Sequence, residues 1–194
     1  MANVYKNIQA KVTSAGSYDD MYESPSATTS IVKSVKLFNS HSGATVYADK
    51  YMSTTMPAFM AHPSTSQNAF AENAAVTIVM GNERFDQGTN FASNTFTAPV
   101  TGRYQFNVQI QIKDAEIAYT YYQLILVTSN VNYVSTIDPR SFDQDVTLLP
   151  LGLSILADMD ASDTAYVQVL AGGTAGGAGH DLLEQSYFSG YLVC

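Results

Sequence analysis

One ten-residue segment, residues 104–113, constrains the fold of this chain more than any other part of the sequence. Every even position in it is aromatic or branched, and every odd position is Gln, Asn or Lys. Successive side chains of a β-strand point to opposite faces of a sheet, whereas a helix would place apolar residues three or four positions apart. The segment is therefore predicted to be a strand with one face in a core and one polar face.

Other segments have the composition and length of strands, namely residues 75–80, 117–127, 146–157, 164–170 and 185–193. Clusters of Gly, Pro, Asn, Asp and Ser separate them, as expected of turns. No long helical pattern interrupts the series. Short strands at this spacing predict an all-β protein, either a sandwich or a barrel.

The first 55 residues follow the same pattern on a smaller scale. Residues 4–12 alternate loosely, and residues 30–38 and 44–51 are predicted to form a hairpin around a five-residue loop. A β unit of this size buries too little apolar surface to be stable alone. We therefore expect an N-terminal β arm over residues 1–55 and a main domain over residues 56–194.

The balance of charge changes near residue 56, at the boundary between the expected arm and the main domain, and it restricts the partners that the chain can bind. Five basic and four acidic residues precede residue 56, while four basic and thirteen acidic residues follow, which gives the net charge of −8. Such a chain has no basic stripe for phosphates, so nucleic acid is not expected as a partner. No apolar run is long enough for a membrane helix, and the N-terminus lacks the apolar region of a signal peptide. We expect synthesis in a cytoplasm and no membrane partner.

Three motifs in the second region resemble a known family. Residues 96–106 have the sequence FTAPVTGRYQF, residues 186–193 have the sequence SYFSGYLV, and residues 57–61 provide a candidate opening strand. In order and spacing, these motifs resemble the C1q/TNF-like jelly roll over residues 57–194. Residues 148–151 and 163–169 lie where that family has two further strands, although Ser162 stands where the family has Gly.

The resemblance implies a jelly-roll sandwich that assembles as a homotrimer. Gly190, inside an apolar strand, indicates close approach of a backbone or a ring, and in this family that neighbour often belongs to another subunit. Tyr119 and Tyr121 are expected on one face of a strand, packed in the trimer interface or in the sandwich. The alternative is that the tyrosines of residues 119–122 recognise carbohydrate. The full set of core or trimer candidates is Tyr104, Phe106, Tyr119, Tyr121, Tyr166, Phe188, Gly190 and Tyr191.

No catalytic or cofactor motif is present in the sequence. His41, His62 and His180 are isolated, and Cys194 is the single cysteine, so neither a zinc site nor an internal disulfide is predicted. The pair His180–Asp181 follows a glycine-rich run, residues 172–179, that is predicted to be a flexible loop rather than a phosphate loop. We predict that the protein is not an enzyme and holds no cofactor.

Asp158, Asp160 and Asp163 form the one acidic cluster considered for a metal. Oxygen ligands suit Ca²⁺, but an acidic turn exposed to solvent between two strands explains the same residues. We therefore predict no metal site there.

The N-terminal residues carry a second resemblance, which leads to a functional hypothesis. Residues 5–10, 28–35 and 43–46 resemble small β modules in structural proteins of tailed bacteriophages. The combined resemblances imply a capsid decoration, or cement, protein on the virion, with the major capsid protein as its partner. Candidate docking residues are Tyr5, Lys6, Ile8, Lys11, Lys33 and Lys36.

Two other functions remain open. A head-fibre or tail receptor-binding module would use the tyrosines of residues 119–122, or the loop of residues 172–180, to bind a host polysaccharide. A C1q-like lectin unrelated to phage is the third possibility, and the absence of a signal peptide disfavours it.

Overall fold

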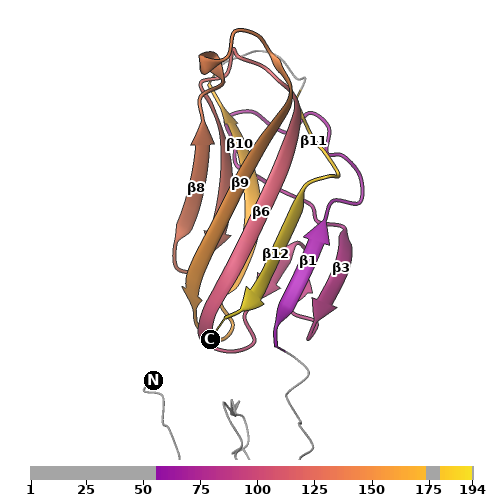
Figure 1. The fold of residues 1–194 in the computed structure, drawn as a ribbon, viewed down its shortest axis with the longest axis vertical. Helices are drawn as coiled ribbons and strands as arrows, with labels where there is room; N and C mark the ends of the chain where they lie inside the picture. Colours follow the sequence, from indigo (N-terminus) through magenta and orange to yellow (C-terminus); the bar gives the residue numbers. More distant parts are fainter. Residues whose placement is uncertain (1–55, 174–179, 194) are drawn as a thin grey trace, which may run out of the picture. The chain divides into compact units, whose positions relative to one another are not determined.

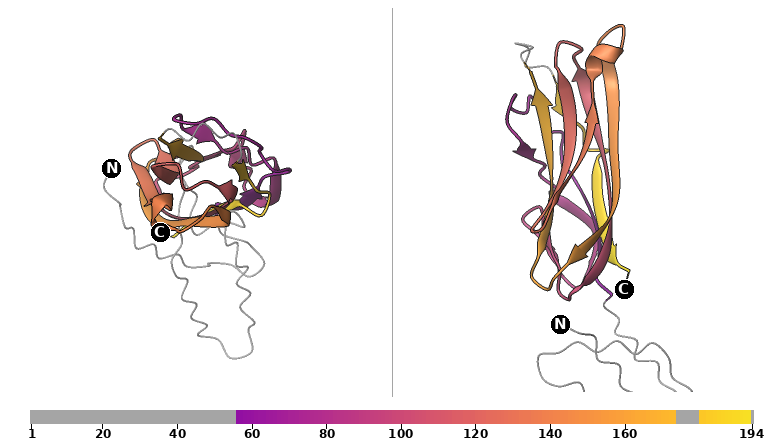
Figure 2. Two further views of the ribbon diagram at one scale, coloured as in Figure 1. Left: turned by 90° about the horizontal axis from the view of Figure 1, so that it is seen from above. Right: turned by 90° about the vertical axis from the view of Figure 1, so that its left-hand side faces the viewer.

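The computed structural model describes residues 56–173 and 180–193, which form two facing layers of β-strands (Figures 1 and 2). All strand pairs run antiparallel. The only helical element of the described residues is a short 3₁₀ turn, Pro139–Ser141, and none of their helices is long and apolar enough to span a membrane. The predicted all-β jelly-roll sandwich is confirmed.

Sheet A is the layer drawn in front in Figure 1. Its order is β9–β6–β12–β1–β3, and β11 pairs with β6 alongside β12. The bounds of its strands are β1 Ala58–His62, β3 Asn82–Gln87, β6 Gly102–Ala115, β9 Val146–Met159, β11 Asp181–Leu182 and β12 Tyr187–Leu192. The segment that dominates the sequence pattern thus becomes the long central strand β6.

Sheet B is the second layer, with the order β4–β5–β10–β7–β8, and β2 also pairs with β10. Its strands are β2 Val76–Thr77, β4 Phe91–Ala92, β5 Thr95–Thr97, β7 Tyr121–Thr128, β8 Asn132–Ile137 and β10 Thr164–Gly172. Residues 121–126 pair with residues 167–172, so β7 and β10 form the centre of this layer.

The core lies between the sheets and is rich in phenylalanine. The ring of Phe59 is stacked on Phe91 and Phe96 at centroid distances of 4.9 and 4.8 Å, and the edge of Phe188 meets it at 4.8 Å. The even positions of β6 from Tyr104 to Ile112 are all buried. Alternation along β6 therefore gives one core face and one outer face, as its sequence predicts.

Gly190 lies opposite Phe106 in the register of β12 and β6. A β-carbon at Gly190 would stand 2.5 Å from Phe106 Cδ1 and 2.9 Å from Phe59 Cε1. The expectation that the neighbour of this glycine belongs to another subunit is wrong, because two rings of the same chain take the space.

Two predicted strands are shorter than the sequence suggests. The segment 75–80 forms ladder pairs only at Val76 and Thr77, because the side chains of Gln67 and Asn94 accept hydrogen bonds from the backbone N–H groups of Val79 and Met80. The segment 117–127 begins as a strand only at Tyr121. The predicted hairpin of residues 30–51 lies outside the described residues.

Candidate functional site

The outer face of sheet A is the candidate functional site, because it is hollowed and contains partly exposed apolar side chains among uncharged polar ones. The outward residues at its centre form three rows across the strands. The rows are Phe85–Met60–Ser189–Asn107–Ser154, then Ala58–Tyr191–Gln105–Leu156, then Tyr187–Gln109–Gly152. None of these central side chains carries a charge, whereas the outward positions nearer the strand ends include Arg103 opposite Asp158 and Lys113 opposite Asp181.

A hydrogen-bonded cluster on β6 and β9 orders the centre of this face. The side-chain amide of Gln105 donates to Ser154 Oγ at 3.0 Å, and Ser154 Oγ donates to Asn107 Oδ1 at 2.9 Å. Polar groups that are already paired lose less when they are desolvated than unpaired ones. The cluster can therefore be covered by another surface at reduced cost.

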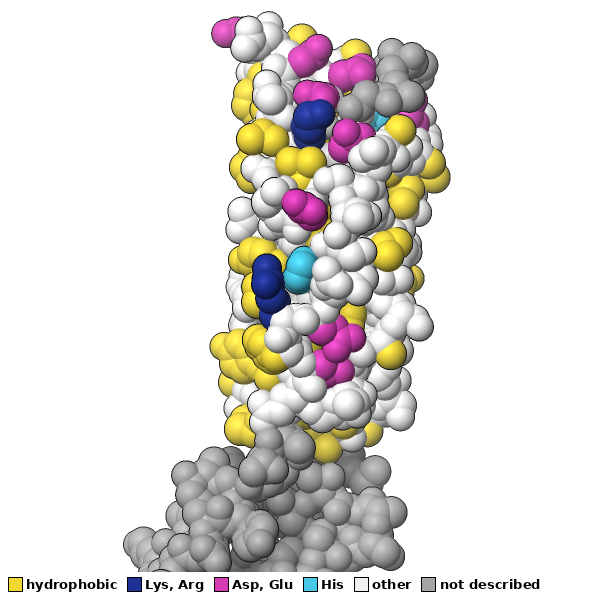
Figure 3. All heavy atoms as spheres, turned by 90° about the vertical axis from the view of Figure 1, so that its right-hand side faces the viewer, with side chains coloured by type: hydrophobic (Ala, Val, Ile, Leu, Met, Phe, Trp, Pro, Cys, Tyr) yellow, Lys and Arg dark blue, Asp and Glu magenta, His cyan; other side chains and the backbone are white. Residues whose placement is uncertain are grey.

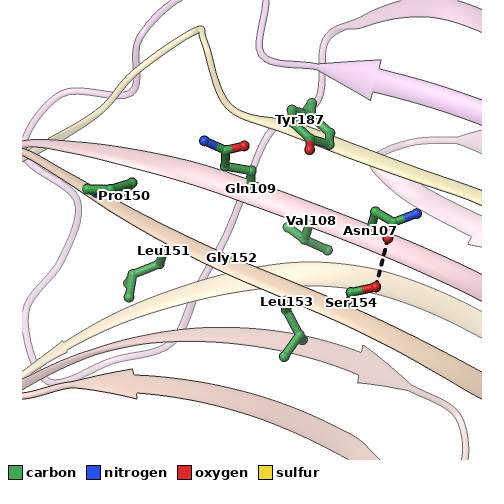
Figure 4. A pocket seen from close by; sticks show the side chains of 9 residues that line it. All are labelled: Asn107, Val108, Gln109, Pro150, Leu151, Gly152, Leu153, Ser154 and Tyr187. Atoms are coloured by element: carbon green, nitrogen blue, oxygen red, sulfur yellow. Dashed lines mark hydrogen bonds between the residues drawn. The ribbon is translucent and has the colours of Figure 1, made fainter.

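An open groove of about 520 Å³ lies over Gly152, next to this cluster. Figure 4 shows the side chains of Gln109 and Tyr187 on one side of the sheet and those of Leu151 and Leu153 on the other. A β-carbon at Gly152 would meet only the Val108 carbonyl oxygen, at 3.7 Å. The groove therefore exists because Gly152 has no side chain.

Three large side chains stand half exposed around the same face. Leu156 is 52% exposed, Phe85 50% and Tyr191 49%. Protein–protein interfaces are enriched in aromatic residues and depleted of charge at their centres. The outer face of sheet A has this composition, and it has no feature of a catalytic site.

The structure divides the predicted core or trimer residues into two groups. Those buried within the chain itself are Tyr104, Phe106, Tyr119, Phe188 and Gly190. Tyr191 lies on the outer face of sheet A, whereas Tyr121 and Tyr166 lie half-buried on sheet B. Of the eight residues, only Tyr191 belongs to the site described above.

Tyr104 shows how a buried hydroxyl is accommodated. Its OH donates to the Val100 carbonyl oxygen at 2.7 Å, across the corner before β6. Burial raises the pKa of the Tyr104 hydroxyl. The residue fixes a corner of the core and is not available to a partner.

The prediction that Tyr119 and Tyr121 share one face of a strand is wrong. Tyr119 precedes β7, in a connection where its own N–H approaches the Glu116 carbonyl oxygen and the N–H of Thr120 bonds to the Gly172 carbonyl oxygen. Tyr119 and Tyr122 are fully buried, with ring centroids 5.3 Å apart. Neither ring is accessible to a carbohydrate, so of the tyrosines in residues 119–122 only the partly exposed Tyr121 stays available for that alternative.

His180 is the third member of this buried aromatic cluster. The prediction that it follows the flexible glycine-rich loop as an exposed residue is wrong. His180 is fully buried, its Nε2–H donates to the Phe70 carbonyl oxygen at 3.0 Å, and its ring lies 5.0 Å from that of Tyr119. Burial raises the pKa of Tyr122 to about 12 and, with the carboxylate of Glu72, also raises the pKa of Tyr119. His180 is therefore a packing residue, not part of an exposed loop.

The acidic cluster closes the turn between β9 and β10. Asp163 Oδ2 accepts hydrogen bonds from the Asp160 N–H and the Asn130 amide, both at 2.8 Å, and Asp160 Oδ1 accepts one from Thr101. Asp158 is exposed at the end of β9. Among residues 56–173 and 180–193 no group of three His, Cys, Asp or Glu side chains is arranged to hold a metal.

The docking candidates cannot be placed in this way. Tyr5, Lys6, Ile8, Lys11, Lys33 and Lys36 all lie outside the described residues. Their role stays a prediction, as does the boundary at residues 55 and 56.

The sequence predicts only part of the outer face of sheet A. Alternation along β6 predicts that its odd positions form a polar face, but no local pattern connects Phe85, Gly152 and Leu156 with that face. A usable signal exists in β9, where Gly152 interrupts a run of large apolar residues. Joining that signal to β6 requires the pairing of Gln109 with Gly152, which is not visible in either strand alone.

Comparison with known proteins agrees with this fold. A family model for the C1q domain matches residues 58–193. The globular domain of zebrafish complement 1qA protein is similar, with 19% identity and a TM-score of 0.53 over 72% of this chain and 98% of that domain. The crystal structure of murine APRIL is similar, with 7% identity and a TM-score of 0.51 over 71% of this chain and 98% of that one. At these identities the two structures support the fold alone.

Proposed function

Because this chain belongs to the C1q domain family, we propose that it is a non-enzymatic structural protein that forms a homotrimer through the outer face of sheet A. Domains of the C1q/TNF type are binding or structural modules and typically form homotrimers. The family therefore supports the oligomeric state, and the surface chemistry of this chain supports the choice of face.

The observation that carries the proposal is the groove over Gly152 within the uncharged centre of the outer face of sheet A. The groove offers a partner subunit a recess, and half-exposed Leu156, two outward positions beyond Gly152 on β9, offers apolar area to bury. Because Gln105, Ser154 and Asn107 are hydrogen-bonded to one another, an arriving surface would cover polar groups that already have partners. A second copy of the chain is the occupant that the family favours.

We extend the proposal to a role in a virion. The trimer would sit on the outside of a phage capsid, with residues 1–55 bound to the major capsid protein and the acidic remainder in solvent. The resemblance of residues 5–10, 28–35 and 43–46 to phage modules supports this role, as does the charge difference between the two regions. Three weak docking arms on one trimer would act as a tight clamp, because each bound arm raises the effective concentration of the others.

A matched pair of charge substitutions tests the trimer face. Leu156 on sheet A and Val134 on sheet B are 52% and 48% exposed, so a lysine at either position costs the isolated domain little. We expect Leu156→Lys to convert the trimer to monomers and Val134→Lys to leave the mass unchanged, both measured by light scattering. A Leu156→Lys protein that stays trimeric would show that another face forms the interface.

Copy number on purified particles tests the virion role. A decoration protein should be present in hundreds of copies over the head, whereas a head-fibre or tail module should be present in a handful, as measured by quantitative mass spectrometry. Deleting residues 1–55 should abolish binding to capsids while residues 56–194 remain trimeric. If the shortened chain still binds capsids as the full chain does, the jelly roll makes the contact instead.

A further inference from the structure

The second layer has an unusual composition. The six strands of sheet B, all within the described residues, contain no Asp, Glu, Lys or Arg. By contrast, the side of the sandwich seen in Figure 3 carries charged side chains of both signs, with acidic ones gathered mainly toward its upper end. The outward positions of sheet B are instead hydroxyl, amide, aromatic and aliphatic residues, among them Tyr121, Gln123, Ile125, Val127, Val134, Thr136, Tyr166, Gln168 and Leu170.

Tyr121 is held against the surface of sheet B by a glycine. It pairs with Gly172 across β7 and β10, and a β-carbon at Gly172 would collide with Cζ and Cε2 of the tyrosine ring. Gly172 is buried, while Tyr121 keeps part of its surface exposed. The ring thus rests on the glycine and remains partly open to solvent, which makes it a rigid aromatic platform with little conformational entropy to lose.

Two amides lie beside this platform and are oriented by neighbouring hydroxyls. The Nε2 atom of Gln123 donates to Thr136 Oγ1 at 3.2 Å, and that of Gln168 donates to Thr77 Oγ1 at 3.4 Å. Gln123 follows Tyr121 on the same face of β7, and Gln168 pairs with the next outward residue, Ile125. Each bond uses one N–H of the amide, and none of the hydrogen bonds of the described residues engages either side-chain carbonyl oxygen.

The ligand chemistry follows from these features. A partner with phosphate or carboxylate groups would lose hydration without meeting a cation, and a basic partner would meet no anion. A neutral glycan avoids both costs, because it has no charged group to desolvate. Its C–H faces pack on aromatic rings, and its hydroxyls exchange hydrogen bonds with amides. Ligand sites commonly combine apolar or aromatic area with a few placed polar groups, and an extended sheet face suits a chain of sugars.

We propose that the outer face of sheet B binds a neutral glycan, with Tyr121 stacking on a sugar ring and Gln123 and Gln168 binding its hydroxyls. This inference goes beyond the proposed trimer and does not require the decoration role. Sheet B is the layer opposite sheet A, so a trimer formed through sheet A would leave three such faces open. Three sites on one particle would bind a repeating polysaccharide more tightly than one site does.

A glycan array that holds neutral and anionic polysaccharides, probed with the full-length chain, tests the proposal. We expect binding to neutral glycans that persists at high salt, because no ion pair contributes to it. Tyr121→Ala should weaken this binding about tenfold, the scale of one lost aromatic contact, while Tyr121→Phe should retain it. Gln123→Leu, which leaves the ring on Gly172, should also weaken it.

The mass and the thermal unfolding of each variant separate this test from the trimer proposal. Tyr121→Ala should remain trimeric and folded while it loses the glycan. The proposal is overturned if no neutral glycan is bound, if only anionic glycans are bound at low salt, or if Tyr121→Ala binds as the wild type does. In any of these cases sheet B would instead be a surface for a protein partner or for solvent alone.

Discussion

The two sheets place a glycine on or near their outer faces, and the consequences are opposite. On sheet A, Gly152 is exposed, and a β-carbon there would meet only one carbonyl oxygen, at 3.7 Å. On sheet B, the ring of Tyr121 covers Gly172, which is buried. The same absence of a side chain leaves a groove in one sheet and a seat for an aromatic ring in the other.

Because the two glycines differ in this way, we propose different partners for the two outer faces. A groove on the same face as half-exposed Leu156 provides complementarity for a protein surface, which must fill recesses to match interior packing density. On sheet B, the Tyr121 ring that rests on Gly172 provides a platform for a smaller planar group, such as a sugar ring. The trimer proposal depends on open space above Gly152, and the glycan proposal depends on contact between the Tyr121 ring and Gly172.

A substitution in the core that both sheets share should cause the largest loss in the free energy of unfolding. The effects of substitutions on the two outer faces can be compared with that loss. Phe106 is fully buried and touches Phe59, Phe96 and Phe188. Phe106→Ala should lower the free energy of unfolding by about 3 to 5 kcal/mol, the usual loss for a buried phenylalanine. Chemical denaturation of the isolated protein measures it, and an unchanged midpoint would mean that the register of β6 is wrong.

The covered glycine should give the next largest effect. Gly172→Ala places a methyl group where the Tyr121 ring lies, so the ring must leave its seat. We expect a loss of about 1 to 3 kcal/mol in the free energy of unfolding, typical of overpacking. The double variant Gly172→Ala with Tyr121→Ala should recover part of this loss, because it removes the collision. Equal stability of Gly172→Ala and wild type would contradict the contact.

Alkaline pH should affect the buried Tyr122, whose side chain points from β7 into the core. Burial raises the pKa of Tyr122 to about 12 from an ordinary value of 10.0, so the folded state favours the neutral hydroxyl. The resulting stabilisation is fully present below pH 10 and is lost as the pH rises toward 12. Thermal unfolding across this range should show a falling midpoint, and Tyr122→Phe should fall less steeply. A midpoint that is independent of pH in this window would contradict the burial of Tyr122.

The exposed glycine should give the smallest effect on stability. Gly152→Ala fits without a clash, so the free energy of unfolding of the subunit should change by no more than about 0.5 kcal/mol. The groove would nevertheless be partly filled, and subunit association should weaken in a dilution series followed by light scattering. A subunit destabilised as much as in Gly172→Ala would erase the distinction between the two glycines.

The sequence predicts the strands of this fold better than it predicts its sites. Alternation along β6 specifies its core and outer faces, because each strand carries its own period of two. Residues that meet only through pairing, such as Gln109 with Gly152 or Tyr121 with Gly172, are far apart in sequence and leave no local pattern. His180 shows the same limit, since its partners Phe70 and Tyr119 come from distant connections.

The mass of the full-length protein in solution, measured by light scattering at micromolar concentration, tests the central claim most directly. We predict about three times the chain mass of 21.0 kDa for the wild type, falling to a single chain mass when Leu156 on the outer face of sheet A becomes lysine. A wild-type protein with the mass of one chain would contradict the account.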